Sequence, residues 1–301
     1  KNHVLEAALS LRPSSREIGF IQAMAREERV VEYVLLPFSD FPDERKAAFG
    51  RENPAKFRKI NLSRITLNDE KTAGSVLAKV KAGTQTFEEA AKADSKDAWA
   101  EQGGASGPRW GYELESELAA AQDAQTLLSL KAGEISPAIK TASGSWAFFR
   151  AESPASEPDF DSPDTLKAVW DYMNKWERGR IEDAAVLRGK DLAVDAAARG
   201  FVSAAGSYGL TVRESTPFPL AYGDAFSSGS TSLFRKIAGE GLEGASTNEK
   251  FLTAAFSLPA GAVSEPLLLQ NAAVGLRVKE IRPAEDTGVQ LIEFYYPYLF
   301  A

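Results

Sequence analysis

Hydrophobic positions follow two different periods along this chain, so both helices and strands are expected. Residues 30–38, 59–67 and 144–152 are rich in β-branched and aromatic residues, which predicts strands. Residues 1–29 and 68–82 instead place apolar residues three and four positions apart, which predicts helices. The mixture indicates an α+β chain.

Shorter segments complete this pattern between residues 41 and 129. Residues 41–57 predict a short helix followed by a turn at Asn53-Pro54, and residues 86–95 predict a second short helix. The glycine-rich stretch 102–111 is interpreted as a loop, and residues 112–129 as a third helix.

The second half of the chain opens with a change in composition. Residues 152–164 are rich in proline, serine and acidic residues, which is typical of a linker. A long amphipathic helix is expected over 165–199, where Gly179 and Gly189 allow two helices in place of one. The apolar tail 291–301 is too short to span a membrane and is expected to pack against a core.

Composition excludes several kinds of chemistry. The 301-residue chain has a formal net charge of −7, which argues against a nucleic-acid partner. It contains no cysteine and a single histidine, His3, so a disulfide scaffold, a thiol nucleophile and a histidine pair within one chain are impossible. No cofactor and no metal are expected. No apolar run is long enough to span a bilayer, and whether a signal peptide or an anchor precedes Lys1 stays open.

Two stretches of the chain resemble one another. SLKAGEIS begins at Ser129 and SLPAGAVS begins at Ser257, an offset of 128 residues, and FEEAA at Phe87 is matched upstream by FVSAA at Phe201. Two segments repeated in the same order favour a duplicated domain over a coincidence of helix–glycine–strand joints. The second copy has no evident first strand.

The order strand, helix, F-x-x-x-A, glycine-rich loop, helix, S-L-x-x-G-x-[IV]-S and strand resembles the parvulin family of peptidyl-prolyl isomerases. The loop SKDAWAEQGGASG, residues 95–107, matches that family's loop motif. The flanking segments resemble periplasmic foldases of the SurA and PpiD kind. The resemblance implies a small antiparallel sheet wrapped by helices, a second degenerate copy and helical chaperone segments.

The resemblance also implies domain boundaries. Residues 1–58 would form an N-terminal chaperone-like segment, and residues 59–152 the parvulin-like domain. Residues 153–185 would be a linker and long helix, and residues 186–301 a second degenerate parvulin-like domain with a C-terminal tail.

The family's catalytic positions map onto altered residues. Parvulins use two histidines on adjacent strands, an Asp or Cys beside them and an apolar pocket for proline. Arg64 stands at the first histidine position, Trp146 at the second, and Asp97 matches the Asp/Cys position. In the second copy Phe251 matches the aromatic pocket position, which is Asp123 in the first copy, and Val274 replaces the last histidine.

These positions predict a binding site more than a catalytic one. Arg64 and Asp97 are expected to form an exposed ion pair across the former site. Trp146, Leu128 and Ile135 are expected to line a groove for an extended apolar peptide, with Phe251 as the contact in the second copy; the alternative is that Trp146 fills the pocket as core.

Two functions therefore compete. The first is a folding factor of the periplasm or cell envelope that binds extended or unfolded polypeptide through modules without the histidine pair. The second is a parvulin-type isomerase that still acts through Asp97 and the groove. A third reading makes the modules spacers in a membrane-anchored scaffold. Client proteins and oligomeric state are left undetermined by the sequence.

Overall fold

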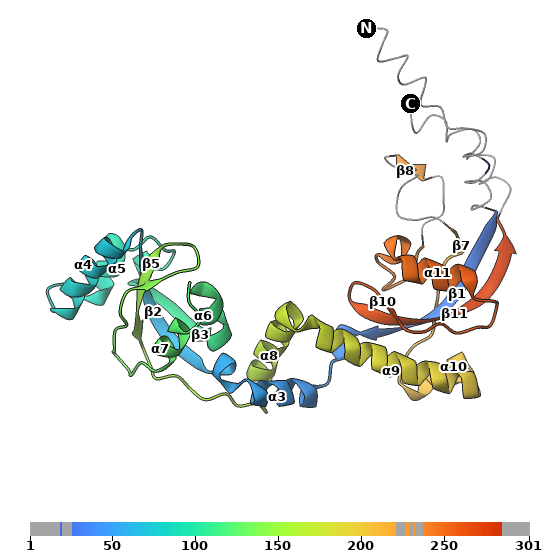
Figure 1. Cartoon of the computed structure of the whole chain (residues 1–301), viewed down its shortest axis with the longest axis horizontal. Coiled ribbons are helices and arrows are strands. Elements are labelled where there is room, and N and C mark those ends of the chain that lie inside the picture. Colours follow the sequence, from blue (N-terminus) through green and yellow to red (C-terminus); the bar gives the residue numbers. More distant parts are fainter. Residues whose placement is uncertain (1–18, 20–25, 221–226, 229–230, 233–236, 285–301) are drawn as a thin grey trace, which may run out of the picture. The chain divides into compact units, whose positions relative to one another are not determined.

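Figure 1 shows the chain as a computed structural model, which describes residues 19, 26–220, 227–228, 231–232 and 237–284. The chain divides into two compact units. One unit comprises Pro42–Glu177, and the other combines Lys1–Phe41 with Arg178–Ala301. The first is called the inserted unit and the second the split unit. No helix in the described part of the chain has both the length and the apolar character needed to cross a membrane.

The inserted unit is built around an antiparallel sheet with the strand order β3-β2-β5-β4. Its strands are β2 (Lys59–Leu67), β3 (Ala105–Trp110), β4 (Ile139–Lys140) and β5 (Trp146–Ala151). Its short helices are α4 (Glu70–Lys81), α5 (Phe87–Asp94), η3 (Ala100–Gln102), α6 (Gly111–Glu117) and α7 (Asp123–Leu128). Local sequence explains their starts: Asp69 caps α4, and Thr86 and Glu89 form a capping box on α5.

Alternation along the strands divides the core of this unit between two faces. Ile60 and Leu62 of β2 pack against α6 and α7, whereas Ile65 and Leu67 pack against α4 and α5. The strand predicted over residues 59–67 is thus buried on both of its faces. The phenyl ring of Phe148 joins the α4/α5 face and meets Phe87 edge-on, with ring centroids 5.8 Å apart.

An aromatic cluster joins a helix pair to this domain. The pair consists of α3 (Asp43–Glu52) and α8 (Pro163–Trp176), and it packs on η2 (Pro54–Phe57) and α6. Phe57 and Tyr172 lie 5.8 Å apart between ring centroids, and Tyr112 and Tyr172 lie 5.5 Å apart. Burial, with the nearby charges of Glu113 and Asp171, raises the pKa of Tyr112 to about 12.

The split unit is built around β1 (Glu27–Pro37), which pairs along its whole length with β11 (Ala272–Pro283). The sheet has the order β10-β11-β1-β6, and β7 also pairs with β1. The remaining strands are β6 (Arg213–Glu214), β7 (Phe218–Pro219) and β10 (Leu267–Leu268), together with a separate hairpin of β8 (Ser227–Ser228) and β9 (Thr231–Ser232).

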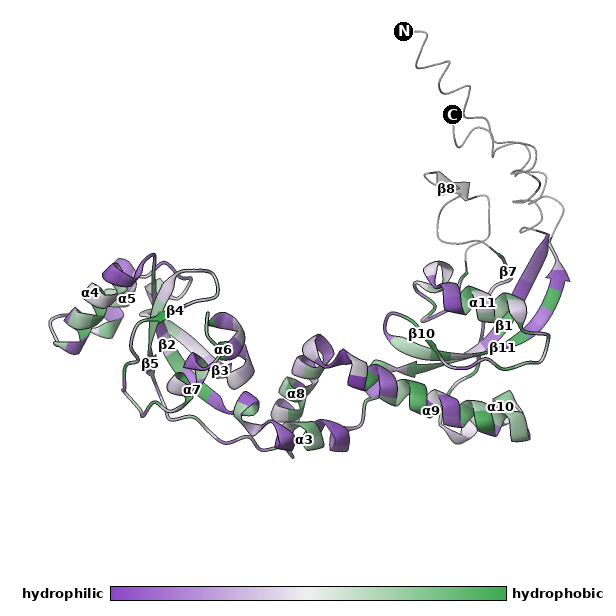
Figure 2. Cartoon of the chain, in the orientation of Figure 1, coloured by the Kyte–Doolittle hydropathy of each residue, from purple (hydrophilic) through white to green (hydrophobic). Residues whose placement is uncertain are grey.

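Helices cover both faces of the β1/β11 pair (Figure 1). They are α9 (Arg178–Arg199), α10 (Phe201–Ser207) and α11 (Glu249–Ser257); two further 3-10 turns are η1 (Phe38–Asp40) and η4 (Ala245–Thr247). Leu192 of α9 and Phe201 of α10 pack on Val34 and Leu36, while Phe251 of α11 packs on the opposite face. The largely apolar character of α10 is visible in Figure 2.

The two sheets share one strand order. In the inserted unit the central pair β2–β5 is flanked by β3 and β4, and in the split unit the central pair β1–β11 is flanked by β6 and β10. The repeated serines occupy equivalent places: Ser136 Oγ accepts a hydrogen bond from Phe149 N at 3.0 Å, and Ser264 Oγ accepts one from Leu276 N at 3.2 Å.

This arrangement corrects the predicted boundaries at the N-terminus. Residues 30–38 were assigned to a chaperone-like segment 1–58, but β1 is a central strand of the split unit, because it pairs with β11 on one edge and with β6 and β7 on the other. The sheet that contains residues 267–283 thus includes a strand from the start of the chain. The strand begins at Glu27, so the helix predicted over 1–29 is wrong at its end, and its earlier part lies almost wholly outside the described residues, as does the tail 291–301.

Three further segments differ from their predictions. Residues 105–110 of the expected loop form strand β3, and the helix expected over 112–129 is divided into α6 and α7. Residues 153–185, expected as a linker and long helix, are not a separate segment: α8 packs on α3 within the inserted unit, and the chain passes between units at Glu177 and Arg178. The long helix does divide in two, at Glu177 rather than at either glycine.

Candidate functional site

The candidate site lies on the face of the inserted unit's sheet that α6 and α7 cover. It is formed by the C-terminal end of β2 and the start of the loop that follows α5. Arg64 and Thr66 project from β2 onto this face by strand alternation with Ile60 and Leu62. The loop is tied to the strand end, because Lys96 N donates to Thr66 O at 2.8 Å and Thr66 N donates to Ser95 Oγ at 3.0 Å. Asp97 is thereby held beside Arg64.

A hydroxyl group links the two charged residues. Arg64 Nε donates to Thr66 Oγ1 at 2.7 Å, and Thr66 Oγ1 donates to Asp97 Oδ2 at 3.0 Å. The direct separation of Arg64 Nε and Asp97 Oδ2 is 3.9 Å. The predicted ion pair is therefore present, but its side chains are only 14% and 9% exposed, so the expectation of an exposed pair is wrong.

The site continues into a second ion pair that sequence reasoning missed. Glu117, the last residue of α6, accepts from Arg64 Nη1 at 3.2 Å and lies 3.5 Å from Arg109 Nε. Both guanidinium groups lie over the ring of Trp99, at 5.9 Å for Arg64 and 5.3 Å for Arg109. Two guanidinium groups and two carboxylates thus balance in charge around the indole ring of Trp99. The four charged residues are separated in the sequence, and the tertiary structure brings them together.

The glycine-rich loop fits this site closely. Gly104 has φ of +86°, and its carbonyl accepts from Arg64 N at 2.7 Å. A Cβ atom on Gly104 would lie 2.7 Å from the carbonyl oxygen of Arg64. Only glycine combines this backbone conformation with such a close approach to β2.

The predicted peptide-binding residues do not share a surface. Leu128 is buried in the α6/α7 core, whereas Ile135 and Trp146 pack against the α4/α5 face. Since β5 alternates between the faces, Ala147 and not Trp146 lies on the same face as Arg64. The groove expected between Trp146, Leu128 and Ile135 therefore does not form, and Trp146 follows the alternative reading as a core-packing residue.

Phe251, the peptide contact expected in the split unit, is also a core residue. Its ring is fully buried and lies 6.3 Å from the ring of Phe218. Val274 is buried on the same face of the sheet, and Asp123 begins α7 in the inserted unit. No group of three or more His, Asp or Glu side chains in the described residues could hold a metal ion.

Two known family models match segments of this chain, one in each unit. A family model described as the PPIC-type PPIase domain matches residues 63–151, and a second model described only as a third domain matches residues 214–283. Residues 63–151 are therefore similar to the parvulin-type domain of PpiC proteins.

Two curated relatives are uncharacterized proteins of spirochaetes. One, from Treponema pallidum (strain Nichols), is 32% identical over 172 residues, which cover 56% of this chain and 64% of the relative. The other, from Borreliella burgdorferi, is 26% identical over 166 residues, which cover 54% of this chain and 32% of the relative. The match thus spans less than two thirds of either relative.

Solved structures also resemble parts of the chain. A PpiC-type isomerase domain is 18% identical and aligns with 35% of this chain and 97% of its own, with a TM-score of 0.30. The foldase PrsA of Streptococcus pneumoniae is 18% identical over 44% of this chain and 48% of its own, with a TM-score of 0.35. A SurA-like chaperone structure from Campylobacter jejuni is 19% identical over 63% of this chain and 70% of its own, with a TM-score of 0.28.

Proposed function

We propose that this chain is a folding factor that binds extended or unfolded polypeptide and has lost the catalytic chemistry of its parvulin-type domain. One observation carries the proposal. At the first histidine position of the family stands Arg64, and Arg64 is engaged by Thr66 and Glu117. A guanidinium group only donates hydrogen bonds, so it cannot replace the acceptor nitrogen of a neutral imidazole.

The second histidine position supports the same conclusion. The residue of β5 that pairs with Arg64 is Phe149, and Ala147 pairs with Thr66; neither side chain offers a polar group. The apolar space beside them is filled by Leu114, Leu118 and Leu128, all of which are buried. A prolyl ring would have to displace these side chains from a close-packed core, which is costly.

We further propose that the split unit is a second parvulin-like module, with the inserted unit placed between its first strand and its first helix. Shared strand order and the matched Ser136 and Ser264 hydrogen bonds support this duplication. By register, Tyr33 in β1 corresponds to Arg64 in β2, since they pair with Leu276 and Phe149. Tyr33 is buried and its hydroxyl donates to Glu240 O at 2.9 Å, so this second site is closed as well.

The alternative function is an active isomerase. Asp97 keeps the family's Asp/Cys position, and Thr66 holds its carboxylate by a hydrogen bond of 3.0 Å. Desolvating and twisting an amide requires no proton transfer in principle, so an enzyme without imidazoles is chemically conceivable.

Two assays on the whole chain separate these functions. In a proline-tetrapeptide isomerisation assay, we expect wild type and Asp97→Ala to match the buffer rate. Activity in wild type that is lost in Asp97→Ala would establish the alternative. In an aggregation assay with a chemically unfolded client protein, we expect the chain to suppress aggregation of the client at an equimolar ratio. Unchanged aggregation at a several-fold excess of the chain would exclude the folding-factor proposal.

A location in the periplasm or cell envelope is part of this proposal. The chain without cysteine suits an oxidising compartment, where free thiols are vulnerable. Fractionation of cells that produce the full-length protein tests the location and any anchor together, by recovery in soluble extracytoplasmic, membrane or cytosolic fractions.

A further inference from the structure

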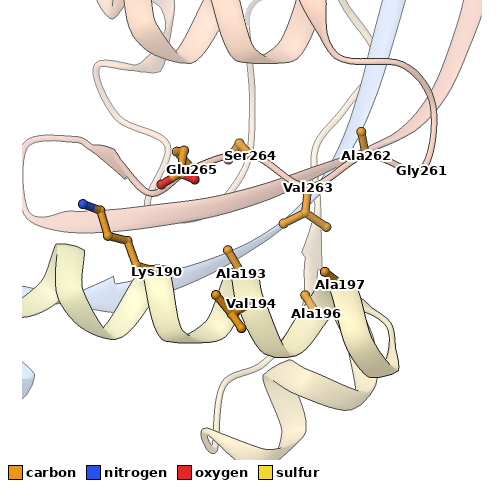
Figure 3. A pocket seen from close by; sticks show the side chains of 10 residues that line it. All are labelled: Lys190, Ala193, Val194, Ala196, Ala197, Gly261, Ala262, Val263, Ser264 and Glu265. Atoms are coloured by element: carbon orange, nitrogen blue, oxygen red, sulfur yellow. The ribbon is translucent and has the colours of Figure 1, made fainter.

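A groove lies in the split unit, on the face of its sheet that α9 and α10 cover. It has a volume of about 810 Å³ and runs between α9 and the segment 261–265 that precedes β10 (Figure 3). Ala193, Val194 and Ala197 form the helical wall, and Ala262 and Val263 form the other. No motif in the sequence pointed to this groove.

The wall formed by segment 261–265 is an unpaired edge of the sheet. Ser264 N donates to Leu276 O at 2.8 Å, and Val278 N donates to Ala262 O at 3.2 Å, both toward β11. Val263 lies between these bonds, so its N–H and C=O groups point away from β11. Neither group has a backbone partner among the described residues, and the same holds for Glu265.

The helical wall is apolar and accessible. Val194 is 72% exposed, and Leu187 and Val202 nearby in the sequence on α9 and α10 are also exposed. Val194 lines the groove together with Ala193, Ala196 and Ala197, so the helical wall offers an apolar surface to a partner.

The equivalent place in the inserted unit is filled. Ile135 forms the same kind of bridge to β5 that Val263 forms to β11, but Trp146, Leu77 and Val80 pack around it. By register, Ala273 replaces Trp146 in the split unit, because these residues pair with Leu36 and Leu67. Small side chains therefore leave space at this place in the split unit.

Charge at the groove is available but balanced. Lys190 and Glu265 lie at the same end of the groove (Figure 3). Both are exposed, and neither forms an ion pair with another described residue. A ligand of strong single charge is not favoured by such a pair, whereas a polar group of either sign can be accommodated.

We propose that this groove is the docking site for an extended, predominantly apolar segment of unfolded polypeptide, which adds a strand to the edge at Val263. Backbone groups of an extended chain satisfy the outward N–H and C=O groups, and its alternate side chains contact the alanine and valine wall of α9. The inference rests on the proposed function, the binding of unfolded polypeptide, and assigns that binding to this groove.

The test measures binding of one defined probe to the whole chain. The probe is an eight-residue peptide of alternating valine and serine, labelled with fluorescein and followed by fluorescence anisotropy. Ala197→Trp fills the groove and Val194→Asp places a charge on its wall. Ala198→Trp is the matched control, because Ala198 is exposed on the same helix but does not line the groove.

We expect at least tenfold weaker binding in Ala197→Trp and Val194→Asp and unchanged binding in Ala198→Trp, with circular dichroism spectra alike. The same peptide N-methylated at alternate amides should lose comparable affinity, because methylation removes the backbone donors. Equal affinity of wild type for both peptides, or of wild type and both groove variants, overturns the proposal, as does a wild type that fails to bind.

Aggregation suppression by the same variants separates this inference from the proposed function. Suppression that survives in Ala197→Trp and Val194→Asp would leave the folding-factor function in place and exclude this groove as its site. Peptide binding without suppression by wild type would support the groove and exclude the wider function.

Discussion

Thr66 is the residue on which the altered site depends, because its hydroxyl accepts from Arg64 and donates to Asp97. Thr66→Val keeps the shape but leaves both charged groups without this partner, so we expect unfolding to become easier by about 1–3 kcal/mol. Urea denaturation measures the change. Thr72→Val removes an exposed hydroxyl bond to Asp69 and serves as the control, with an expected effect below about 0.5 kcal/mol. Equal effects would show that the Thr66 link is unimportant.

Gly104 is constrained both by its backbone and by its surroundings. Gly104→Ala and Gly144→Ala share the strain of a positive φ, about 1–2 kcal/mol. Of the two added Cβ atoms, only the one at position 104 would lie within 4 Å of another residue. The overlap with the Arg64 carbonyl should add about 1–3 kcal/mol to the cost at Gly104. Thermal unfolding of the two variants compares these costs directly, and melting temperatures that fall equally would contradict the close approach.

At the scale of elements, strands β1, β2 and β5 and helices α4 and α5 were predictable, because their patterns agree with their burial. The glycine-rich stretch at 102–111 was mistaken for loop. Glycine is unfavourable in strands, and β3 forms only because β2 offers a neighbour; the register shift between Leu62 and Ser63 accommodates its extra residue. The site could be located through Arg64 and Asp97, but Glu117 and Arg109 carried no signal of their partnership.

The contacts of α6, η2 and α8 predict a pH dependence at Tyr112. Burial raises the pKa of Tyr112 to about 12, while an unfolded tyrosine titrates near about 10. A raised pKa in the folded state means that its stabilisation is complete below pH 10 and is lost as the pH rises toward 12. Urea unfolding at pH 9.5 and 11.5 should show a smaller loss in Tyr112→Phe than in wild type. An identical loss in both proteins would assign the dependence to other groups.

At the scale of the whole molecule, the split unit is a discontinuous domain: the inserted unit separates its two stretches of chain in the sequence. Its two parts meet where Arg178 lies over the ring of Phe38, at 5.1 Å, so the chain leaves and re-enters this unit at neighbouring places. This proximity explains how a whole domain can be inserted at this point. The two ends of a domain are often close together, so an inserted domain can connect to two neighbouring positions of its host.

Excision of residues 42–177 tests this organisation. With Phe41 joined to Arg178 by a short glycine-serine linker, the split unit should keep a cooperative thermal transition and its β-sheet circular dichroism signal. The same excised chain without residues 27–37 should be unfolded, since β1 is hydrogen-bonded to β11, β6 and β7. If both chains behave alike, the N-terminal strand is not part of that core.

The sequence by itself determined the local elements and the resemblance of residues 59–152 to a parvulin-type domain, because periodicity, turn residues and motif positions act over short stretches of chain. Only the tertiary structure decided which strand completes the second sheet, on which face Trp146 lies and where an open groove remains. Those properties depend on pairing between residues as far apart as Glu27 and Pro283 and on the sizes of side chains that meet in space. Strand pairing and packing of this kind are not encoded in the pattern of any single segment.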